Sequence, residues 1–241
     1  MAPGLQRTSF NSSGLVRLLA DMTVADGAVA VGAPSNQTLA ERLGLWLDWT
    51  DAITLSAALN GVPSAAGAVA ESGTPASAEA IANECARTRA GLAKAIAAEG
   101  LFAVGKTGPL HSATDFPTCR RAYLAHQRAM TTRLGALRAQ VRAALAKASP
   151  SLQRLAALDA AMDDALAARE GHLLAKVPGL LERHFVRLRQ AQPEGSADGV
   201  AEFLEHMQAV LLAELALRLQ PIEAMVDVLM SAKGDEAARR S

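Results

Sequence analysis

The chain has 241 residues, of which 50% are apolar and only 3% aromatic, and its 24 Lys and Arg balance its 24 Asp and Glu. A neutral total charge argues against a general affinity for polyanions, which usually requires an excess of basic residues. Two cysteines are too few for a disulfide framework. No window of about 18 apolar residues predicts a transmembrane helix, and no basic segment followed by an apolar one predicts a signal peptide. We therefore expect a cytoplasmic protein.

The fold class follows from the alanine content and from the spacing of the apolar residues. Much of the apolar content is alanine, which favours helices and their close packing. No segment alternates apolar and polar residues between turn signals, as a β-strand would. We predict an all-α helical bundle. Its parts are expected to be an N-terminal helical segment (1–60), a flexible linker (61–76), the bundle itself (77–233) and a charged tail (234–241).

The N-terminal segment contains both tryptophans of the chain. Thr38 with Glu41 has the spacing of a capping box, which predicts a helix from there to about Asn60. Trp46 and Trp49 place apolar surface on more than one side of this helix. In one interpretation they belong to a core buried on a wide face. In the other they form an exposed aromatic surface that docks onto a partner.

Residues 100–107 match the phosphate-loop pattern G-x-x-x-x-G-K-T. Such a loop binds phosphate when it follows a β-strand and opens a helix. Here the residues before Gly100 have a helical pattern, and Pro109 opposes a helix directly after Thr107. We expect a surface turn between helices. Nucleotide binding, which would use Lys106 and Thr107, is the alternative.

The stretch from Pro117 to Lys176 dominates the pattern of the chain. Apolar residues recur there at intervals of seven, at Tyr123, Met130 and Leu137 and again at Leu134 and Val141. This heptad-like seam is typical of a helix that buries one stripe against another helix. Asp115 or Phe116 is predicted to cap the start. Ser149 and Pro150 have the chemistry of a cap and of a first helical residue, so we predict a long antiparallel, coiled-coil-like helical hairpin over residues 117–176.

The first part of this stretch carries charges of one sign. From Phe116 to Leu158 the chain has eight Lys or Arg and no Asp or Glu. Five of these arginines fall within a sector of about 100° that faces away from the apolar seam: Arg120, Arg121, Arg128, Arg138 and Arg142. One interpretation is a surface for nucleic acid or another anionic partner. The other is that these arginines pair with acidic segments of the same chain.

No arrangement of residues predicts a catalytic, cofactor-binding or metal site. Glu202 and His206 have helical ligand spacing, but di-iron sites on helices need two such pairs. Zinc-binding spacings and a serine in a nucleophile elbow are both missing from the sequence. We therefore predict that the protein is not an enzyme and holds no cofactor.

Three runs of the sequence resemble a known family: Arg42–Asn60 (RLGLWLDWTDAITLSAALN), Tyr123–Met130 (YLAHQRAM) and Val177–Arg187 (VPGLLERHFVR). They are similar to the proteobacterial family catalogued as domain of unknown function 3348, and the likeness covers most of the chain outside residues 26–36 and 61–76. The family has no assigned activity or catalytic residues. Its genes often lie beside genes for membrane proteins of the OmpA-like, motor-stator-like kind. The resemblance therefore implies a cytoplasmic accessory to an envelope assembly.

Two functions follow as hypotheses from these observations. The first is a non-enzymatic helical scaffold that binds itself or another helical protein through its heptad-like helices and through Trp46 and Trp49. The second is a binder of nucleic acid or of an anionic surface through the basic helix at residues 120–142.

Overall fold

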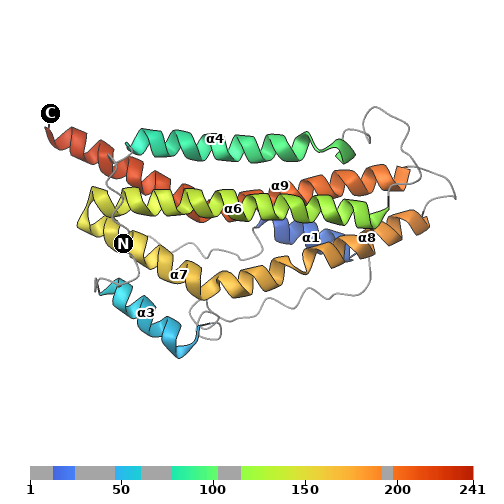
Figure 1. The fold of residues 1–241 in the computed structure, drawn as a ribbon, viewed down its shortest axis with the longest axis horizontal. Helices are drawn as coiled ribbons and strands as arrows, with labels where there is room; N and C mark the ends of the chain where they lie inside the picture. Colours follow the sequence, from blue (N-terminus) through green and yellow to red (C-terminus); the bar gives the residue numbers. More distant parts are fainter. Residues whose placement is uncertain (1–12, 25–46, 61–76, 103–114, 192–197, 241) are drawn as a thin grey trace, which may run out of the picture. The chain divides into compact units, whose positions relative to one another are not determined.

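A computed structural model describes residues 13–24, 47–60, 77–102, 115–191 and 198–240 of the chain, without the side chains of residues 235–240. Within these ranges the chain forms helices and no β-strand (Figure 1). The helices of these ranges are α1 (Gly14–Val24), α3 (Trp49–Leu59), α4 (Ala78–Ala97), α6 (Phe116–Ala148), α7 (Pro150–Leu174), α8 (Val177–Ala191) and α9 (Asp198–Arg240). The predicted all-α fold is confirmed.

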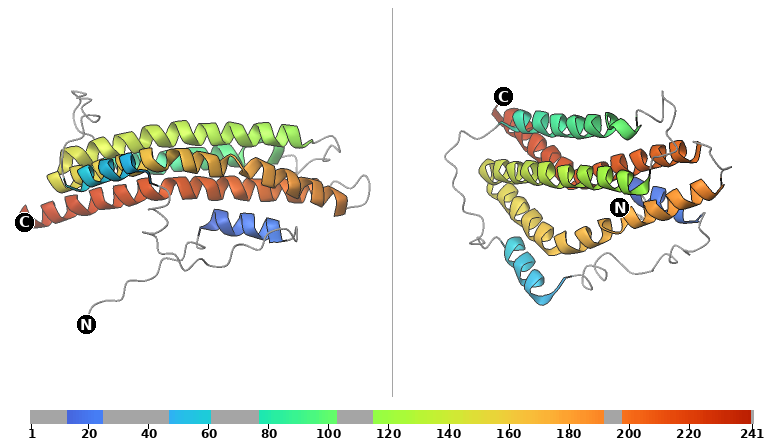
Figure 2. Two further views of the ribbon diagram at one scale, coloured as in Figure 1. Left: turned by 90° about the horizontal axis from the view of Figure 1, so that it is seen from below. Right: turned by 45° about the vertical axis from the view of Figure 1, so that its right-hand side comes forward.

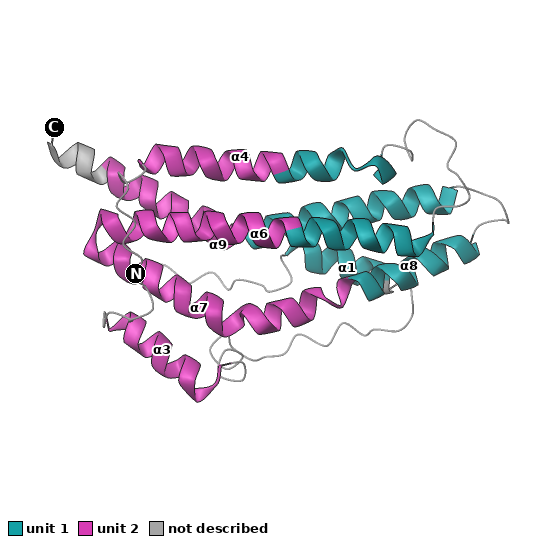
Figure 3. Ribbon diagram, viewed as in Figure 1, with its two compact units in different colours: residues 1–34, 92–128, 178–218 teal, residues 35–91, 129–177, 219–241 magenta. Residues whose placement is uncertain are grey.

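The chain divides into two compact units (Figure 3). Unit 1 consists of residues 1–34, 92–128 and 178–218, and unit 2 of residues 35–91, 129–177 and 219–241. Each unit is assembled from segments far apart in the sequence. Helices α4, α6 and α9 have residues in both units, and α8 belongs to unit 1 except for its first residue, Val177. The domain boundaries read from the sequence stay a prediction, and the expected linker at 61–76 lies outside the described residues.

Local side-chain chemistry explains where α6 and α7 begin. Oδ1 of Asp115 accepts a hydrogen bond from the Thr118 backbone N–H at 3.0 Å, and Oγ of Ser149 accepts one from the Leu152 N–H at 3.3 Å. Each bond satisfies a backbone donor that has no partner inside the first turn of its helix. Pro150 occupies the first turn of α7, where its missing N–H costs nothing. Of the two predicted caps, Asp115 caps α6, which begins at Phe116, and the predicted break at Ser149 is confirmed.

An aromatic cluster holds three helices of unit 1 together. Phe116 of α6, Phe185 of α8 and Phe203 of α9 have ring centroids 4.9 to 6.2 Å apart, in tilted and edge-to-face arrangements. Each such pair contributes about 0.5–1.5 kcal/mol beyond the area that it buries. Around this cluster the unit buries Cys119 and Tyr123 of α6 completely. The unit 1 parts of α6, α8 and α9 run alongside one another (Figure 2).

Unit 2 has its own apolar core. The second half of α6 contributes five buried residues to it: Met130, Leu134, Leu137, Val141 and Leu145. The unit 2 part of α9 contributes a second buried row, namely Leu219, Ile222, Met225, Val226 and Leu229. At the surface, Arg89 of α4 pairs with Glu223 of α9 at 3.0 Å, and Lys233 pairs with Glu79. Exposed pairs of this kind add little stability, so the buried rows are what hold the unit together.

Helix α3 packs on α7 within unit 2 (Figures 1 and 2). It is shorter than predicted, because Asp48 is extended and α3 begins only at Trp49. The Asp48 carboxylate accepts the Asp51 N–H at 2.8 Å, and the Asp51 carboxylate accepts the Asp48 N–H at 3.1 Å. This capping box is itself a start signal, which is why one continuous helix through this point is wrong. The capping box predicted at Thr38 lies outside the described residues.

Candidate functional site

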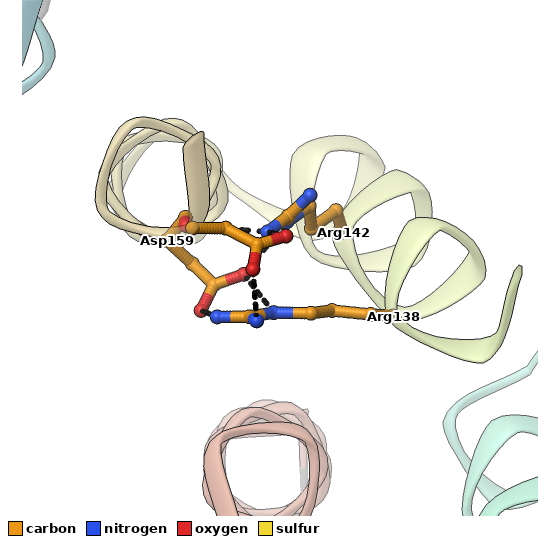
Figure 4. Close-up of polar contacts among 4 residues, drawn as sticks. Arg138, Arg142 and Asp159 are labelled. Atoms are coloured by element: carbon orange, nitrogen blue, oxygen red, sulfur yellow. Dashed lines mark hydrogen bonds and ion pairs between the residues drawn. The ribbon is translucent and has the colours of Figure 1, made fainter. Parts of the chain in front are cut away.

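Two arginines of α6 and two aspartates of α7 form an ion-pair cluster in unit 2 (Figure 4). Asp159 accepts hydrogen bonds from Nη2 of Arg138 and from Nε of Arg142, both at 2.6 Å. Asp163 lies 2.5 Å from Nη1 of Arg138 and 2.8 Å from Nη2 of Arg142. Both pairs are four residues apart, so one helical turn of α6 faces one turn of α7.

The geometry of this cluster explains its electrostatics. Burial alone would raise the pKa of Asp159, but the hydrogen bonds and charges of Arg138 and Arg142 outweigh it and hold that pKa below its ordinary value. Burial lowers the pKa of Arg138, and its bonds to Asp159 and the charge of Asp163 reverse that effect and raise it. Arg138 and Asp159 are therefore both charged at neutral pH, and the donors of Arg138 and Arg142 are turned toward α7.

The five arginines that share one sector of α6 therefore do not form one uniform basic surface. Arg138 and Arg142 face the aspartates of α7, whereas Arg120, Arg121 and Arg128 are exposed on the part of α6 that belongs to unit 1. Nη2 of Arg121 donates to Oγ1 of Thr118, one turn earlier, at 3.1 Å. A polyanion approaching α6 would meet these three arginines with their charges exposed.

The outer face of α3 is apolar and exposed. Trp49 is 81% exposed, and Ile53, one turn later, is 53% exposed. Ala58 is the buried residue of α3, and it lies half a turn of rotation away from Trp49 because nine residues correspond to two and a half turns. One side of α3 therefore faces its own unit while Trp49 and Ile53 face water. Trp46, the other candidate, lies outside the described residues.

A second polar network lies in the core of unit 1, and sequence reasoning missed it. Glu214 of α9 has no exposed surface. Its carboxylate accepts hydrogen bonds from the Tyr123 phenol at 2.6 Å, from Nε2 of Gln127 at 3.0 Å and from Nη2 of Arg218 at 2.8 Å. Burial, and then the Glu214 charge, raise the pKa of Tyr123 far above its ordinary value. The available signal was Glu214 itself, an acid among apolar residues spaced three and four apart.

Two histidines form a third polar cluster in unit 1. Nε2 of His184 on α8 lies 2.8 Å from Nδ1 of His206 on α9. Nη2 of Arg187 lies 2.5 Å from Nδ1 of His184, and Nη1 of Arg187 donates to the Met22 carbonyl of α1 at 2.8 Å. The histidines are 22 residues apart, so no short motif in the sequence identifies this cluster.

Other chemistry-bearing residues do not assemble into a site within the described parts of the chain. No group of three or more His, Cys, Asp or Glu there has the arrangement of a metal site. Burial raises the pKa of the Cys119 thiol to about 11, so this thiol stays protonated and unreactive. Most of the phosphate-loop pattern, including Lys106 and Thr107, lies outside the described residues.

The described residues define an all-α protein with a paired charge cluster and an exposed apolar helix face. None of its helices in those ranges is long and apolar enough to cross a membrane. The model of the family described as "Protein of unknown function (DUF3348)" matches residues 1–231. The chain therefore belongs to that family, as the three runs of sequence predicted. No curated protein and no solved structure matches the chain.

Proposed function

We propose that the protein is a non-enzymatic, cytoplasmic interaction protein that binds another helical protein through the outer face of α3. The observation that carries this proposal is the exposure of Trp49 and Ile53 on consecutive turns of one helix. Exposed apolar residues scattered singly need no explanation. Two large ones aligned on a helix form the pattern with which an amphipathic helix enters an apolar groove.

The presence of a tryptophan on this surface supports a role in binding. It is enriched among the few interface residues that contribute most of the binding free energy, because its large rigid ring buries much area at a small cost in conformational entropy. Helix α3 is held by its capping box at one end and by α7 along its inner face. A partner would therefore meet side chains that are already positioned.

The size of α3 indicates that the partner supplies the groove. The helix has 11 residues, so it is about 16 Å long and about 10 Å wide. Two copies pairing through α3 alone would bury far less than the roughly 800 Å² per partner that a stable interface needs. A concave surface that surrounds Trp49 and Ile53 comes closer to that area. The resemblance of the chain to its family suggests an envelope assembly as the setting for this partner.

Affinity capture with the full chain and a photo-crosslinker at Ala52, between the two apolar residues, tests the proposal. We expect Trp49→Ala and Ile53→Ala to lose a specific crosslinked protein that the wild type captures. Val186→Ala is the matched control, because Val186 is 46% exposed on α8 in the other unit. An identical crosslinking pattern for all four proteins would overturn the proposal.

The binding variants have a built-in check of folding. Since Trp49 is 81% exposed, Trp49→Ala is expected to change the free energy of unfolding by no more than about 0.5 kcal/mol. Urea unfolding measures this directly. A larger loss would mean that Trp49 stabilises the fold rather than a complex.

An anionic partner is the second candidate, and the exposure of Arg120, Arg121 and Arg128 favours it. Changing all three to Gln would make the affinity for a DNA duplex less dependent on salt concentration. The slope of log affinity against log salt concentration should fall by the amount expected from losing up to about three phosphate contacts. Arg133→Gln is the control, because Arg133 is exposed on another side of the same helix. Binding to the duplex that is weak in the wild type, or unaffected in the triple variant, would exclude this candidate.

A further inference from the structure

The cluster of His184, His206 and Arg187 joins three helices of unit 1. His184 is only 4% exposed, and its ring packs against Phe203 with the centroids 6.2 Å apart. Hydrogen bonds form a chain that runs from the Met22 carbonyl of α1, through Arg187 and His184 of α8, to His206 of α9. The cluster belongs to unit 1, whereas α3 belongs to unit 2, and its role is independent of the function proposed above.

Hydrogen-bond chemistry fixes the protonation of these groups. A guanidinium can only donate, so Nδ1 of His184, 2.5 Å from Arg187, must accept. A neutral imidazole whose Nδ1 accepts carries its proton on Nε2. Nε2 of His184 therefore donates to Nδ1 of His206 at 2.8 Å, and His206 is also neutral with its proton on Nε2. Each imidazole is held in one tautomer by its neighbour.

Neither ring can take a second proton without breaking the chain. A proton on Nδ1 of His184 would point at the Arg187 guanidinium and place two cations in contact. A proton on Nδ1 of His206 would oppose the N–H of His184. We propose that this cluster is an acid-sensitive latch, which is closed when both histidines are neutral and opens when either one is protonated.

The element that the latch holds is the C-terminal end of α1. The Met22 carbonyl is among the last four carbonyls of that helix, which have no partner within it. Arg187 satisfies this carbonyl and places a positive charge where the helix dipole favours one. When His184 is protonated, its repulsion of Arg187 removes this cap. The end of α1 then loosens from α8.

Glu214 and Arg218 of α9 pair with each other away from water. The following charged residues on the helices around the pair are exposed: Arg17 and Asp21 on α1, Glu182, Arg183 and Arg189 on α8, Asp198, Glu202 and Glu205 on α9, and Asp115, Arg120 and Arg121 on α6. Water and salt screen their effect on a buried imidazole. His126 of α6 lies 3.0 Å from Glu99.

Hydrogen exchange of the full chain, followed by mass spectrometry on the peptide covering α1, tests the latch. Free imidazole titrates near pH 6.5, so between pH 7.5 and 5.5 the protection factor of α1 should fall about tenfold for each proton taken up. The double variant His184→Gln/His206→Asn keeps amide groups near the ring nitrogens but cannot titrate. We expect its α1 protection to change less than twofold over the same range.

The control variant is His172→Asn, because His172 is exposed on α7 in unit 2. It should show the same fall in α1 protection as the wild type. Wild-type protection that is equal at both pH values would overturn the latch, and so would an equal fall in the double variant. If the double variant does not fold, ¹⁵N spectra of wild-type histidines decide the question. A protonated Nδ1 on His184 at pH 7.5 contradicts the latch, and an unprotonated one that gains its proton as α1 loses protection supports it.

Discussion

Tyr123 on α6 donates its phenol proton to Oε2 of Glu214 on α9 at 2.6 Å, and neither residue has exposed surface. Arg218 and Gln127 also donate to this carboxylate, which lies in an apolar core. A buried charge is tolerated only when such donors replace the lost water. The network therefore fixes how α6 and α9 are rotated and aligned within unit 1.

Removing the acid from this network should destabilise the protein strongly. Glu214→Ala leaves the Arg218 charge and the Tyr123 hydroxyl without their acceptor, so we expect a loss of about 3–5 kcal/mol in the free energy of unfolding. Tyr123→Phe removes one hydrogen bond to a charged group and should cost about 1.5–3 kcal/mol. Urea unfolding measures both. The variant Glu214→Leu/Arg218→Leu removes both partners of the ion pair. It should recover part of the unfolding free energy that Glu214→Ala loses.

The Asp159 cluster predicts how stability depends on pH. The pKa of Asp159 is lowered in the folded protein, so its contribution is fully present above the ordinary aspartate pKa of about 3.9. That contribution is lost as the pH falls through the lowered folded value. We expect the difference in unfolding free energy between wild type and Asp159→Asn to be constant from pH 7 to 5 and to shrink below about pH 4. A difference that already shrinks near pH 6 would contradict this assignment.

Gly135→Ala should stabilise α6. Gly135 lies inside the helix, and a Cβ added there meets no atom within 4 Å. Alanine favours the helical backbone over glycine by about 1 kcal/mol, partly because it restricts the unfolded chain. We expect a gain of about 0.5–1 kcal/mol in urea unfolding. Gly171→Ala in α7 has equally open space and should give a similar gain.

We expect both thiols to be unreactive in the folded protein. Cys85 and Cys119 are buried, and burial raises the pKa of each thiol, in Cys119 to about 11. Because the thiolate is the reactive form, a chromogenic disulfide reagent at pH 8 should label neither residue until urea unfolds the chain. Rapid labelling of Cys119→Ser in buffer would show that Cys85 becomes accessible in the native state.

Features set by neighbouring residues could be predicted from the sequence. The caps at Asp115 and Ser149 act within one turn of their helices, so the local sequence is enough to identify them. The apolar face of α6 could also be predicted, since every residue of the heptad-like seam is buried. Whether α6 and α7 form a true coiled coil stays a prediction.

The spacing at which buried residues recur along α6 could not be predicted from the sequence and is seen only in the structure. Buried residues recur at intervals of 11, at Cys119, Met130 and Val141 and again at Tyr123, Leu134 and Leu145. A spacing of seven continued past Val141 would reach Ala148, which is exposed. Since 11 residues make almost exactly three helical turns, this spacing keeps one stripe buried without the left-handed supercoil of a heptad repeat.

Contacts between distant segments could not be predicted from one sequence. The five arginines share a sector of α6, but only the rotation of α7 decides that Arg138 and Arg142 meet Asp159. The same holds for His184 and His206, which meet because α8 and α9 turn these faces toward each other. Helical periodicity gives the face on which a residue lies, and tertiary packing decides what lies opposite.

The shortness of α3 has a consequence for how its surface is displayed. A helix of 11 residues is marginal by itself in water, since isolated helices below about 12–15 residues barely form. Trp49 and Ile53 therefore line up only while α7 supports α3. If unit 2 loosens, the two side chains lose their common orientation before any residue of the surface has changed. Recognition through α3 would in that way report whether the protein beneath it is intact.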